Sequence, residues 1–375
     1  MAGSGRKPSR KPDCLKLVSK IAASHAAVQF PFSRTESLVK SLLLILGRRL
    51  ASLLPVFIIV SMLVFVALRA LPVNPAQMAL PPQATLEQVE AKRLEMGLDK
   101  PIWEQYAIWV RQAVQGDFGD SAQYRMPTSD VVMARLPATI ELSLGALVFA
   151  LVVGVSGGLA IFVVRGTPLE GAGVFGTSVL MALPDFLLSL LFILLLGVLI
   201  PVFPVNGRLD PGLIVPDRTG FLVLDSFLTG DPKLIGSALS HMVLPVMALG
   251  LAFAPLVIRV LHSSLISTYQ ESYIRQARMR GLSETEILFG QALKNAILPV
   301  IILVGTQFGL LFGGTLLVEV IFSYPGIGNL MLRSMQSSDL EVIQTVALIY
   351  CATTLLFNSL ADAAAYMINP RLRTR

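Results

Sequence analysis

The chain has 375 residues, of which 54% are hydrophobic and only 14% are charged. Its mean hydropathy of +0.70 is higher than a soluble globular protein carries, so most of the chain must lie in lipid. The formal net charge of +6 does not indicate nucleic-acid binding, because the basic residues gather at the edges of apolar blocks, where they orient a membrane protein. An ordinary cytosolic enzyme is excluded.

The first segments of the chain predict a cytoplasmic extension followed by a membrane span. Residues 1–43 are basic and poor in apolar side chains, so we expect a disordered extension. The first transmembrane helix is predicted at 44–71, where the stretch from Leu50 to Leu68 carries no charge. A cleaved signal peptide fits less well, because its apolar core would be shorter and would end in small residues.

The next segment, residues 72–135, is polar and too long for a simple connection. It contains two probable amphipathic helices, near Thr85–Met96 and Trp103–Val114, each bounded by proline or glycine. We therefore expect a helical loop on the extracytoplasmic side.

Residues 136–368 contain five more apolar blocks, which predicts a five-helix transmembrane core and an all-α polytopic membrane protein with six transmembrane helices. The blocks cover 137–164, 175–202, 236–259, 296–321 and 342–368. When both termini, including the tail 369–375, are placed in the cytoplasm, the cytoplasmic segments contain more Lys and Arg than the extracytoplasmic segments do. This bias predicts the orientation.

The sequence contains no recognisable catalytic site. Its three histidines, His25, His241 and His262, belong to no zinc motif. A phosphate-binding P-loop needs a Gly-Lys pair, and the chain has none. We expect no catalytic residue, no metal and no cofactor in this chain, so any ATP must be hydrolysed by a partner.

The polar segment 263–295 is predicted to be a cytoplasmic loop built as a rigid helix-turn-helix. One helix runs through Tyr273–Arg280 and stops at Gly281, and a second starts at Ser283, with Glu286 completing a capping box.

Two interpretations of this loop remain open. Ile274, Ala277 and Leu282 offer the small apolar face that a docking groove on a partner needs. Alternatively, the loop is an amphipathic connector whose arginines bind lipid phosphates.

This loop also carries a family resemblance. The segment Tyr273-Ile-Arg-Gln-Ala-Arg-Met-Arg-Gly-Leu282, with Ala292-Leu-Lys-Asn-Ala-Ile-Leu-Pro299 behind it, resembles the EAA loop of permeases from binding-protein-dependent ABC importers, in the form found in the dipeptide, oligopeptide and nickel branch. Many members have Glu-Ala-Ala where this chain has Arg275-Gln276-Ala277, and proline in place of Lys294. These departures match the peptide-type branch.

The resemblance covers roughly residues 44–375. Four further motifs appear in the family's order: Gly97-Leu-Asp-Lys-Pro101, Arg135-Leu-Pro-Ala-Thr-Ile-Glu141, Phe322-Ser-Tyr-Pro-Gly-Ile-Gly328 and Asn369-Pro-Arg-Leu-Arg373. After the first span the chain has Val73-Asn74-Pro75, where Gly-Asp-Pro is usual.

The resemblance implies the first of two permease subunits of an ATP-driven importer, with a type I importer fold, in the bacterial inner membrane. Its implied partners are a second homologous permease, two ATPase subunits that bind ATP and Mg, an extracytoplasmic solute-binding protein and membrane lipid. The EAA loop would form the coupling helix that contacts an ATPase subunit. The residues implied in coupling are Tyr273, Arg275, Ala277, Arg278, Gly281 and Leu282.

The solute implied by the resemblance is a dipeptide or oligopeptide. Glutathione and nickel complexes also travel through this branch. The scarcity of histidine in the spans argues against direct nickel coordination in this chain.

Several polar residues fall in or near the spans and are candidates for a translocation path. An ionisable group near the bilayer centre costs at least about 2.5 to 3.5 kcal/mol, so each should face protein or water. Asp185 follows Pro184, where a local break would expose it to a cavity. Glu141 and Glu319 lie near the outer ends of spans, where solvation at the interface is the favoured explanation.

Asn358 and Asp362 are spaced i, i+4 and share a helix face, which favours interhelical hydrogen bonding over a place in the path. Glycines with GxxxG spacing permit close approach of helices, either within the chain or to another subunit. The two pairs are Gly154 with Gly158 and Gly309 with Gly313.

A secondary transporter or channel driven by an ion gradient is the main alternative. It would need a relay of buried carboxylates or inverted repeats with broken helices, and the sequence shows scattered acids and no clear repeat. An intramembrane enzyme would need a paired nucleophile and base or a metal pair, which the sequence does not offer.

Overall fold

The computed structural model describes residues 34–70, 74–78, 80 and 83–368. Most of the predicted extension and the whole predicted tail, 369–375, lie outside these residues. The chain divides into two compact units, Met1–Gly47 and Arg48–Arg375. The described part of the first unit is the beginning of helix α2 (Arg34–Arg69), which starts inside the segment predicted as an extension. All contacts given below lie within the second unit.

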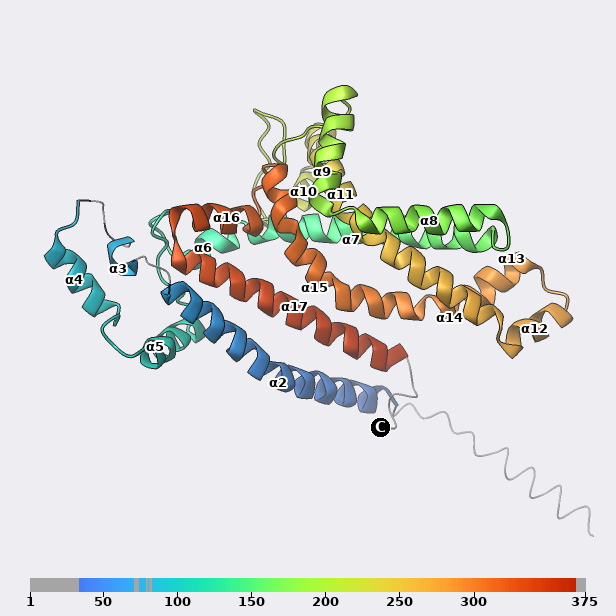
Figure 1. Cartoon of the computed structure of the whole chain (residues 1–375), viewed down its shortest axis with the longest axis horizontal. Coiled ribbons are helices and arrows are strands. Elements are labelled where there is room, and N and C mark those ends of the chain that lie inside the picture. The colour runs from blue at the N-terminus through green and yellow to red at the C-terminus, as the bar shows by residue number, and fades with distance from the viewer. Residues whose placement is uncertain (1–33, 71–73, 79, 81–82, 369–375) are drawn as a thin grey trace, which may run out of the picture. The chain divides into compact units, whose positions relative to one another are not determined.

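The second unit is built from helices, and no β-strand occurs in the described part of the chain, which confirms the predicted all-α class (Figure 1). After α2 the elements are α3 (Pro75–Met78), α4 (Leu86–Glu95), α5 (Ile102–Val114), α6 (Thr128–Met133), α7 (Leu136–Val163), α8 (Pro168–Ala182), α9 (Asp185–Phe192), the π-helical η1 (Ile193–Leu199), α10 (Leu222–Thr229), α11 (Pro232–Tyr269), α12 (Ser272–Met279), α13 (Glu284–Ile287), the π-helical η2 (Leu288–Ala292), α14 (Leu293–Ala296), α15 (Leu298–Ile321), α16 (Ile327–Ser337) and α17 (Leu340–Ile368).

The apolar helices account for the six predicted spans. Four are long enough to cross a bilayer alone: Thr128–Val163, Pro232–Tyr269, Leu298–Ile321 and Leu340–Ala363. The bent pair α8 and α9 with η1 forms a fifth apolar segment, and the part of α2 from Leu53 to Arg69 is a shorter apolar helix.

The third span, predicted at 175–202 with a local break at Pro184, is broken there in the structure. The structure has two pieces, α8 and then α9 continued by η1, bent by 98° at the break between them (Figure 1). The cause is Pro184, because a residue that precedes proline is driven out of the helical region. Leu183 accordingly adopts φ −89° and ψ 119°.

Helix α11 lies at the centre of the core. It packs along α7 and also contacts α8, α9 and α15, while α15 packs along α17. One apolar cluster joins α7, α9, α11, α15, α16 and α17. A second cluster joins the ends of α7 and α11 to α12, α13 and α14, which fixes the helix-turn-helix to the spans.

Three of the four predicted close-packing glycines contact other helices of this chain. A Cβ on Gly154 would lie 2.5 Å from Val257 on α11, and one on Gly158 would lie 3.2 Å from the Ile258 carbonyl oxygen. A Cβ on Gly309 would lie 2.7 Å from Thr354 on α17. Gly313 has no heavy atom within 4 Å of such a Cβ.

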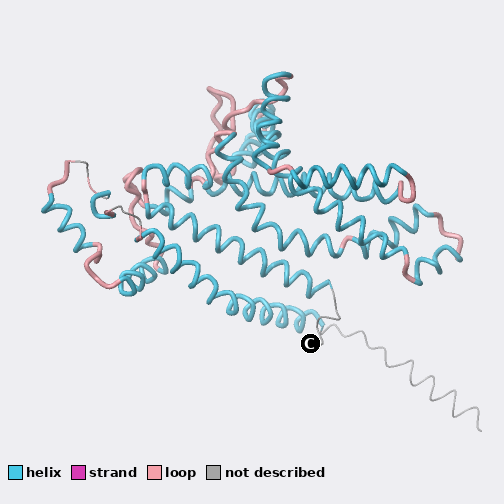
Figure 2. Tube along the Cα trace, viewed as in Figure 1, coloured by secondary structure: helices cyan, strands magenta, loops and turns pink. Residues whose placement is uncertain are grey.

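The two helices predicted after the first span are present as α4 and α5, and α4 begins at a capping box formed by Thr85 and Gln88. Irregular backbone is most extensive between η1 and α10, in residues 200–221, drawn pink in Figure 2.

Candidate functional site

The turn between α12 and α13 is set by the chain's own local chemistry. Gly281 has φ +80°, a left-handed conformation that glycine adopts without steric cost. Its N–H donates to the Arg278 carbonyl at 2.9 Å, and the N–H of Leu282 donates to the Ala277 carbonyl at 3.3 Å. This pair of bonds is a Schellman motif. The predicted helix stop at Gly281 is therefore confirmed.

Helix α13 starts at the predicted capping box. The Glu286 backbone N–H donates to Ser283 Oγ at 3.3 Å, and the Ser283 N–H donates to Glu286 Oε2 at 2.8 Å. The hydrogen bond from the Ser283 backbone lowers the pKa of Glu286. The carboxylate therefore stays charged at neutral pH and holds the start of the helix.

The faces of α12 are arranged differently from the docking interpretation. Ile274 and Ala277, expected to meet a partner, are completely buried in the second apolar cluster. That expectation is wrong because both side chains pack in a cluster with α11 and α13 of the same chain. The surface of α12 is instead basic and polar, and its exposed apolar residue is Met279, with 79% of its surface accessible.

Tyr273 and Asn295 close the loop at its other end. The Asn295 side-chain nitrogen donates to the Tyr273 hydroxyl oxygen at 2.8 Å, which joins α12 to α14. Of the residues that the sequence singled out for coupling, Arg275 and Arg278 are exposed, and Leu282 is partly buried behind the turn.

A stack of aromatic and basic side chains ties this loop to the end of α7. The Tyr269 ring lies 4.7 Å from the Phe162 ring, measured between centroids. The guanidinium carbons of Arg165 and Arg278 lie 4.8 and 5.6 Å from the Tyr269 ring centroid, within cation–π range. Arg278 also donates to Glu284 Oε1 at 2.7 Å.

The ion pair of Arg278 and Glu284 shifts both groups toward their charged forms. The hydrogen bond from Arg278 lowers the pKa of Glu284, and the same bond raises the pKa of Arg278. Sequence reasoning picked out Arg278 and missed Glu284, Tyr269 and Arg165. The sequence signal for Glu284 is its place directly after the helix start at Ser283, six residues from Arg278.

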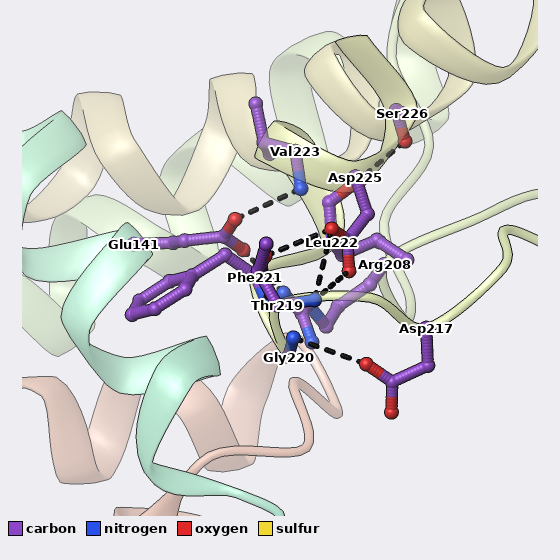
Figure 3. Close-up of polar contacts among 10 residues, drawn as sticks. All are labelled: Glu141, Arg208, Asp217, Thr219, Gly220, Phe221, Leu222, Val223, Asp225 and Ser226. Carbon is purple, nitrogen blue, oxygen red and sulfur yellow. Dashed lines mark hydrogen bonds and ion pairs between the residues drawn. The ribbon is translucent and has the colours of Figure 1, made fainter. Parts of the chain in front are cut away.

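At the other end of α7, Glu141 is not solvated as expected. Its side chain is only 9% accessible and forms an ion pair with Arg208 from the loop 200–221. Glu141 Oε1 also accepts a hydrogen bond from the Val223 N–H at 2.8 Å. The carboxylate therefore joins α7 to the loop and to the start of α10 (Figure 3).

Asp225 organises the same loop from α10. Its carboxylate accepts a hydrogen bond from the N–H of Arg218 at 3.1 Å. It also accepts hydrogen bonds from the N–H and the hydroxyl of Thr219, as Figure 3 shows. Burial acts to raise the pKa of Asp225, but the hydrogen bonds from Thr219 and Arg218 outweigh it and lower the pKa. Sequence analysis did not find Arg208, which lies in a loop without helical periodicity, or Asp225, which lies in the short helix α10 after it.

Glu319 is also buried, which corrects the expectation of interfacial solvation. It accepts hydrogen bonds from the Thr139 hydroxyl at 2.6 Å and from the N–H groups of Gly328 and Asn329 at 2.8 and 3.0 Å. The carboxylate thus occupies the N-terminus of α16, where the helix dipole favours a negative charge. The sequence signal that was overlooked is the glycine-rich start of α16.

The remaining path candidates lie on two helices, Asp185 on α9 and the other two on α17. Asp185 begins α9, and its Oδ1 accepts from the Phe186 N–H at 2.8 Å. Its Oδ2 would lie 3.3 Å from a Cβ placed on Gly314, so Asp185 sits beside α15. Asn358 and Asp362 are partly buried on α17. No cluster of metal-binding side chains occurs among the residues that the structure describes.

Comparisons with known proteins agree over nearly the whole chain. The family described as "binding-protein-dependent transport system inner membrane component" matches residues 146–374, and the corresponding N-terminal family matches residues 42–143. The chain is 33% identical over 330 residues to the dipeptide transport system permease protein DppB of Escherichia coli strain K12, which covers 87% of this chain and 97% of that protein.

Further matches include a second permease and a solved structure. The glutathione transport system permease protein GsiC of Escherichia coli strain K12 is 32% identical over 326 residues, covering 87% of this chain and 97% of that protein. A solved structure of the methionine ABC transporter MetNI in an inward facing conformation matches with a TM-score of 0.46 and 15% identity, over 62% of this chain and 93% of that chain.

Proposed function

Because the chain belongs to the family of inner membrane components of binding-protein-dependent transport systems, we propose that it is a permease subunit through which an ATP-driven importer moves short peptides. The observation that carries the proposal is 33% identity across 97% of a dipeptide permease. Similarity of this extent covers the spans, the loop 200–221 and the helix-turn-helix together, and is not confined to one motif.

Peptides are the substrate class that the relatives favour. DppB is named as a dipeptide permease and GsiC as a glutathione permease, and glutathione is itself a small peptide. The two proteins match this chain with nearly equal sequence identity, so identity does not decide between an ordinary dipeptide and glutathione as the solute. A transport assay with both labelled solutes decides between them.

Energy for transport comes, in this proposal, from ATPase subunits that bind ATP and Mg. The chain itself lacks a Gly-Lys pair for a P-loop. A second homologous permease completes the path, and an extracytoplasmic binding protein delivers the solute. Both termini and the segment 263–295 lie in the cytoplasm, as the distribution of Lys and Arg favours.

The exposed side of α12 is the proposed contact for an ATPase subunit. It carries Arg275, Gln276 and Arg280 around the exposed Met279, which suits a groove with an apolar floor and an acidic rim. The buried Ile274 and Ala277 fix this surface to the core of the chain.

Helix α12 can transmit motion to the spans because the loop that contains it is held rigidly to them. The Schellman turn, the capping box and the stack around Tyr269 hold α12 and α13 to the ends of α7 and α11. A displacement of α12 by an ATPase therefore moves these spans as a body, which is the kind of motion that alternating access needs.

Uptake by cells, and by vesicles prepared from them, tests this proposal. Cells that carry the chain with its partners should take up a labelled dipeptide, and uptake should stop when ATP is depleted but continue when the proton gradient is collapsed. The chain should also co-purify with ATPase subunits in mild detergent. Uptake that follows the proton gradient, by a chain that purifies alone, would favour a secondary transporter instead.

A further inference from the structure

Helix α5 packs on the first span through aromatic side chains. The Phe65 ring lies 5.5 Å from the Tyr106 ring and 5.9 Å from the Trp109 ring, measured between centroids. The Tyr106 hydroxyl lies 2.7 Å from Ser61 Oγ and donates to the Ile58 carbonyl at 3.3 Å. These contacts fix which side of α5 faces α2.

A second side of α5 faces a polar cavity of about 770 Å³. This side contributes Gln105, Ile108, Trp109 and Gln112, and neighbouring segments add charged residues such as Lys92, Lys100, Asp117 and Arg125. The interior of this part of the chain is therefore polar where α5 faces it.

The third side of α5, opposite the cavity, is apolar, and three of its four side chains are exposed while that of Val110 is partly buried. Trp103, Ala107, Val110 and Val114 recur at i, i+4, i+7 and i+11, so they form one line along the helix. Trp103 is 67% accessible and Val114 is 82% accessible. A helix in water turns its apolar line inward. Here the order is reversed, which indicates that the surroundings outside α5 are less polar than the cavity behind it.

The contacts with α2 show what those surroundings are. Ser61 lies eight residues before Arg69 on the helix, or about 12 Å along its axis at a rise of 1.5 Å per residue. It therefore lies within the apolar segment Leu53–Arg69. Other sides of this segment expose Ile59 and Leu63 by 64% and 65%. Helix α5 is thus packed on the apolar segment of a helix whose other sides suit contact with lipid.

We propose that α5 lies in the membrane surface as an interfacial helix, with the line from Trp103 to Val114 buried among lipid acyl chains. Tryptophan is favoured at this depth, because its apolar ring and polar N–H suit the boundary between acyl chains and headgroups. Glu104 and Arg111 flank the line, where they reach headgroups and water. The lipid surface thereby holds the polar cavity at the membrane edge. This inference does not depend on which solute is transported.

The two tryptophans of the chain, Trp103 and Trp109, make the inference directly measurable. The full chain, in the complex in which it purifies, is placed in vesicles made from lipids brominated near the headgroup end of the acyl chains. Trp103→Phe leaves only the Trp109 indole of this chain, and Trp109→Phe leaves only Trp103. Subtracting the double variant removes the emission of every other protein present.

Brominated lipid should quench most of the Trp103 emission, and bromine placed near the terminal methyl groups should quench it less. Iodide in the water should leave Trp103 largely unquenched while it reaches Trp109 beside the cavity. The inference is overturned if iodide quenches Trp103 and brominated lipid does not, since α5 then lies in water. It is also overturned if neither agent quenches Trp103, since another protein then covers the line.

Discussion

Arg278 and Glu284 face each other across the Gly281 turn, with Arg278 Nε 2.7 Å from Glu284 Oε1 and Arg278 Nη2 3.3 Å from Oε2. The pair joins α12 to α13, and Arg278 also lies over the Tyr269 ring. Because the bond from Arg278 lowers the pKa of Glu284, the pair is fully charged at neutral pH and is lost only as pH falls through that lowered pKa.

Exchanging the charges of Arg278 and Glu284 tests whether the ion pair between them is needed for transport. We expect Arg278→Glu to reduce the number of peptides transported per ATP hydrolysed, because two carboxylates then repel across the turn. The double change Arg278→Glu with Glu284→Arg should recover most of that ratio. The measurement is uptake and ATP hydrolysis in the same vesicles. A double variant no better than the single one would show that Arg278 acts through another contact.

Gly281 should tolerate asparagine and not proline. Its left-handed backbone costs other residues about 1 to 2 kcal/mol, and asparagine accepts this conformation best among them. Proline would also remove the N–H that donates to Arg278. We expect Gly281→Pro to abolish uptake while the protein still inserts in the membrane, and Gly281→Asn to retain it. Normal uptake by the proline variant would contradict the rigid coupling loop.

Met279 is the position at which the proposed ATPase contact should be tested, because Ala277 is buried and its replacement would damage the fold itself. We expect Met279→Glu to weaken ATPase binding about thirtyfold, as the loss of about 2 kcal/mol at a hot spot implies. The matched control is Phe289→Glu, which changes another exposed apolar side chain on the neighbouring segment. Co-purification measures both. Equal binding by wild type and Met279→Glu would move the contact elsewhere.

Glu141 and Arg208 should show the coupling expected of a buried ion pair. Glu141→Gln leaves the Arg208 charge without its partner, which typically costs about 3 to 5 kcal/mol, so thermal stability in detergent should fall clearly. Removing both charges in Glu141→Gln with Arg208→Gln should cost less than the single change. If the two single effects simply add, the pair does not hold the loop to α7.

Asp185→Asn removes a charge and preserves the local hydrogen bond, since an asparagine oxygen also accepts from the Phe186 N–H. The helix dipole contribution that is lost amounts to about 0.3 to 1 kcal/mol, too little to unfold the protein. We expect slower peptide uptake with unchanged ATPase recruitment. An unchanged uptake rate would assign Asp185 to packing and exclude it from the path.

The parts of the structure that the sequence predicts well are those set by neighbouring residues. Apolar blocks predicted the spans, and the glycine stop and Ser283 with Glu286 predicted the α12–α13 turn, because these features depend on only a few consecutive residues. A local break at Pro184, just before Asp185, was also predicted, but its angle of 98° was not.

The remaining features depend on residues far apart in the chain. Glu141 meets Arg208 and Glu319 meets Thr139, pairs separated by 67 and 180 positions, and no local pattern indicates either partner. Because Glu141 and Glu319 lie near span ends, the sequence wrongly suggested that water solvates them. Ile274 and Ala277 show a related limit, because helical spacing reveals that two side chains share a face but not whether that face meets the chain's own core or a partner.

Helix α11 has a mechanical consequence. Its 38 residues span about 57 Å, nearly twice the roughly 30 Å of a hydrocarbon core, so part of the helix must extend beyond that core, and α12 follows directly after its last residues. Pro245 and Pro255 lie inside it, each lacking the N–H that would stiffen the helix. Over the stretch from Pro255 to Tyr269, about 21 Å, a tilt of about 10° displaces the tip by about 4 Å. A small change of angle at Pro255 therefore becomes a larger displacement of the helix end that precedes α12.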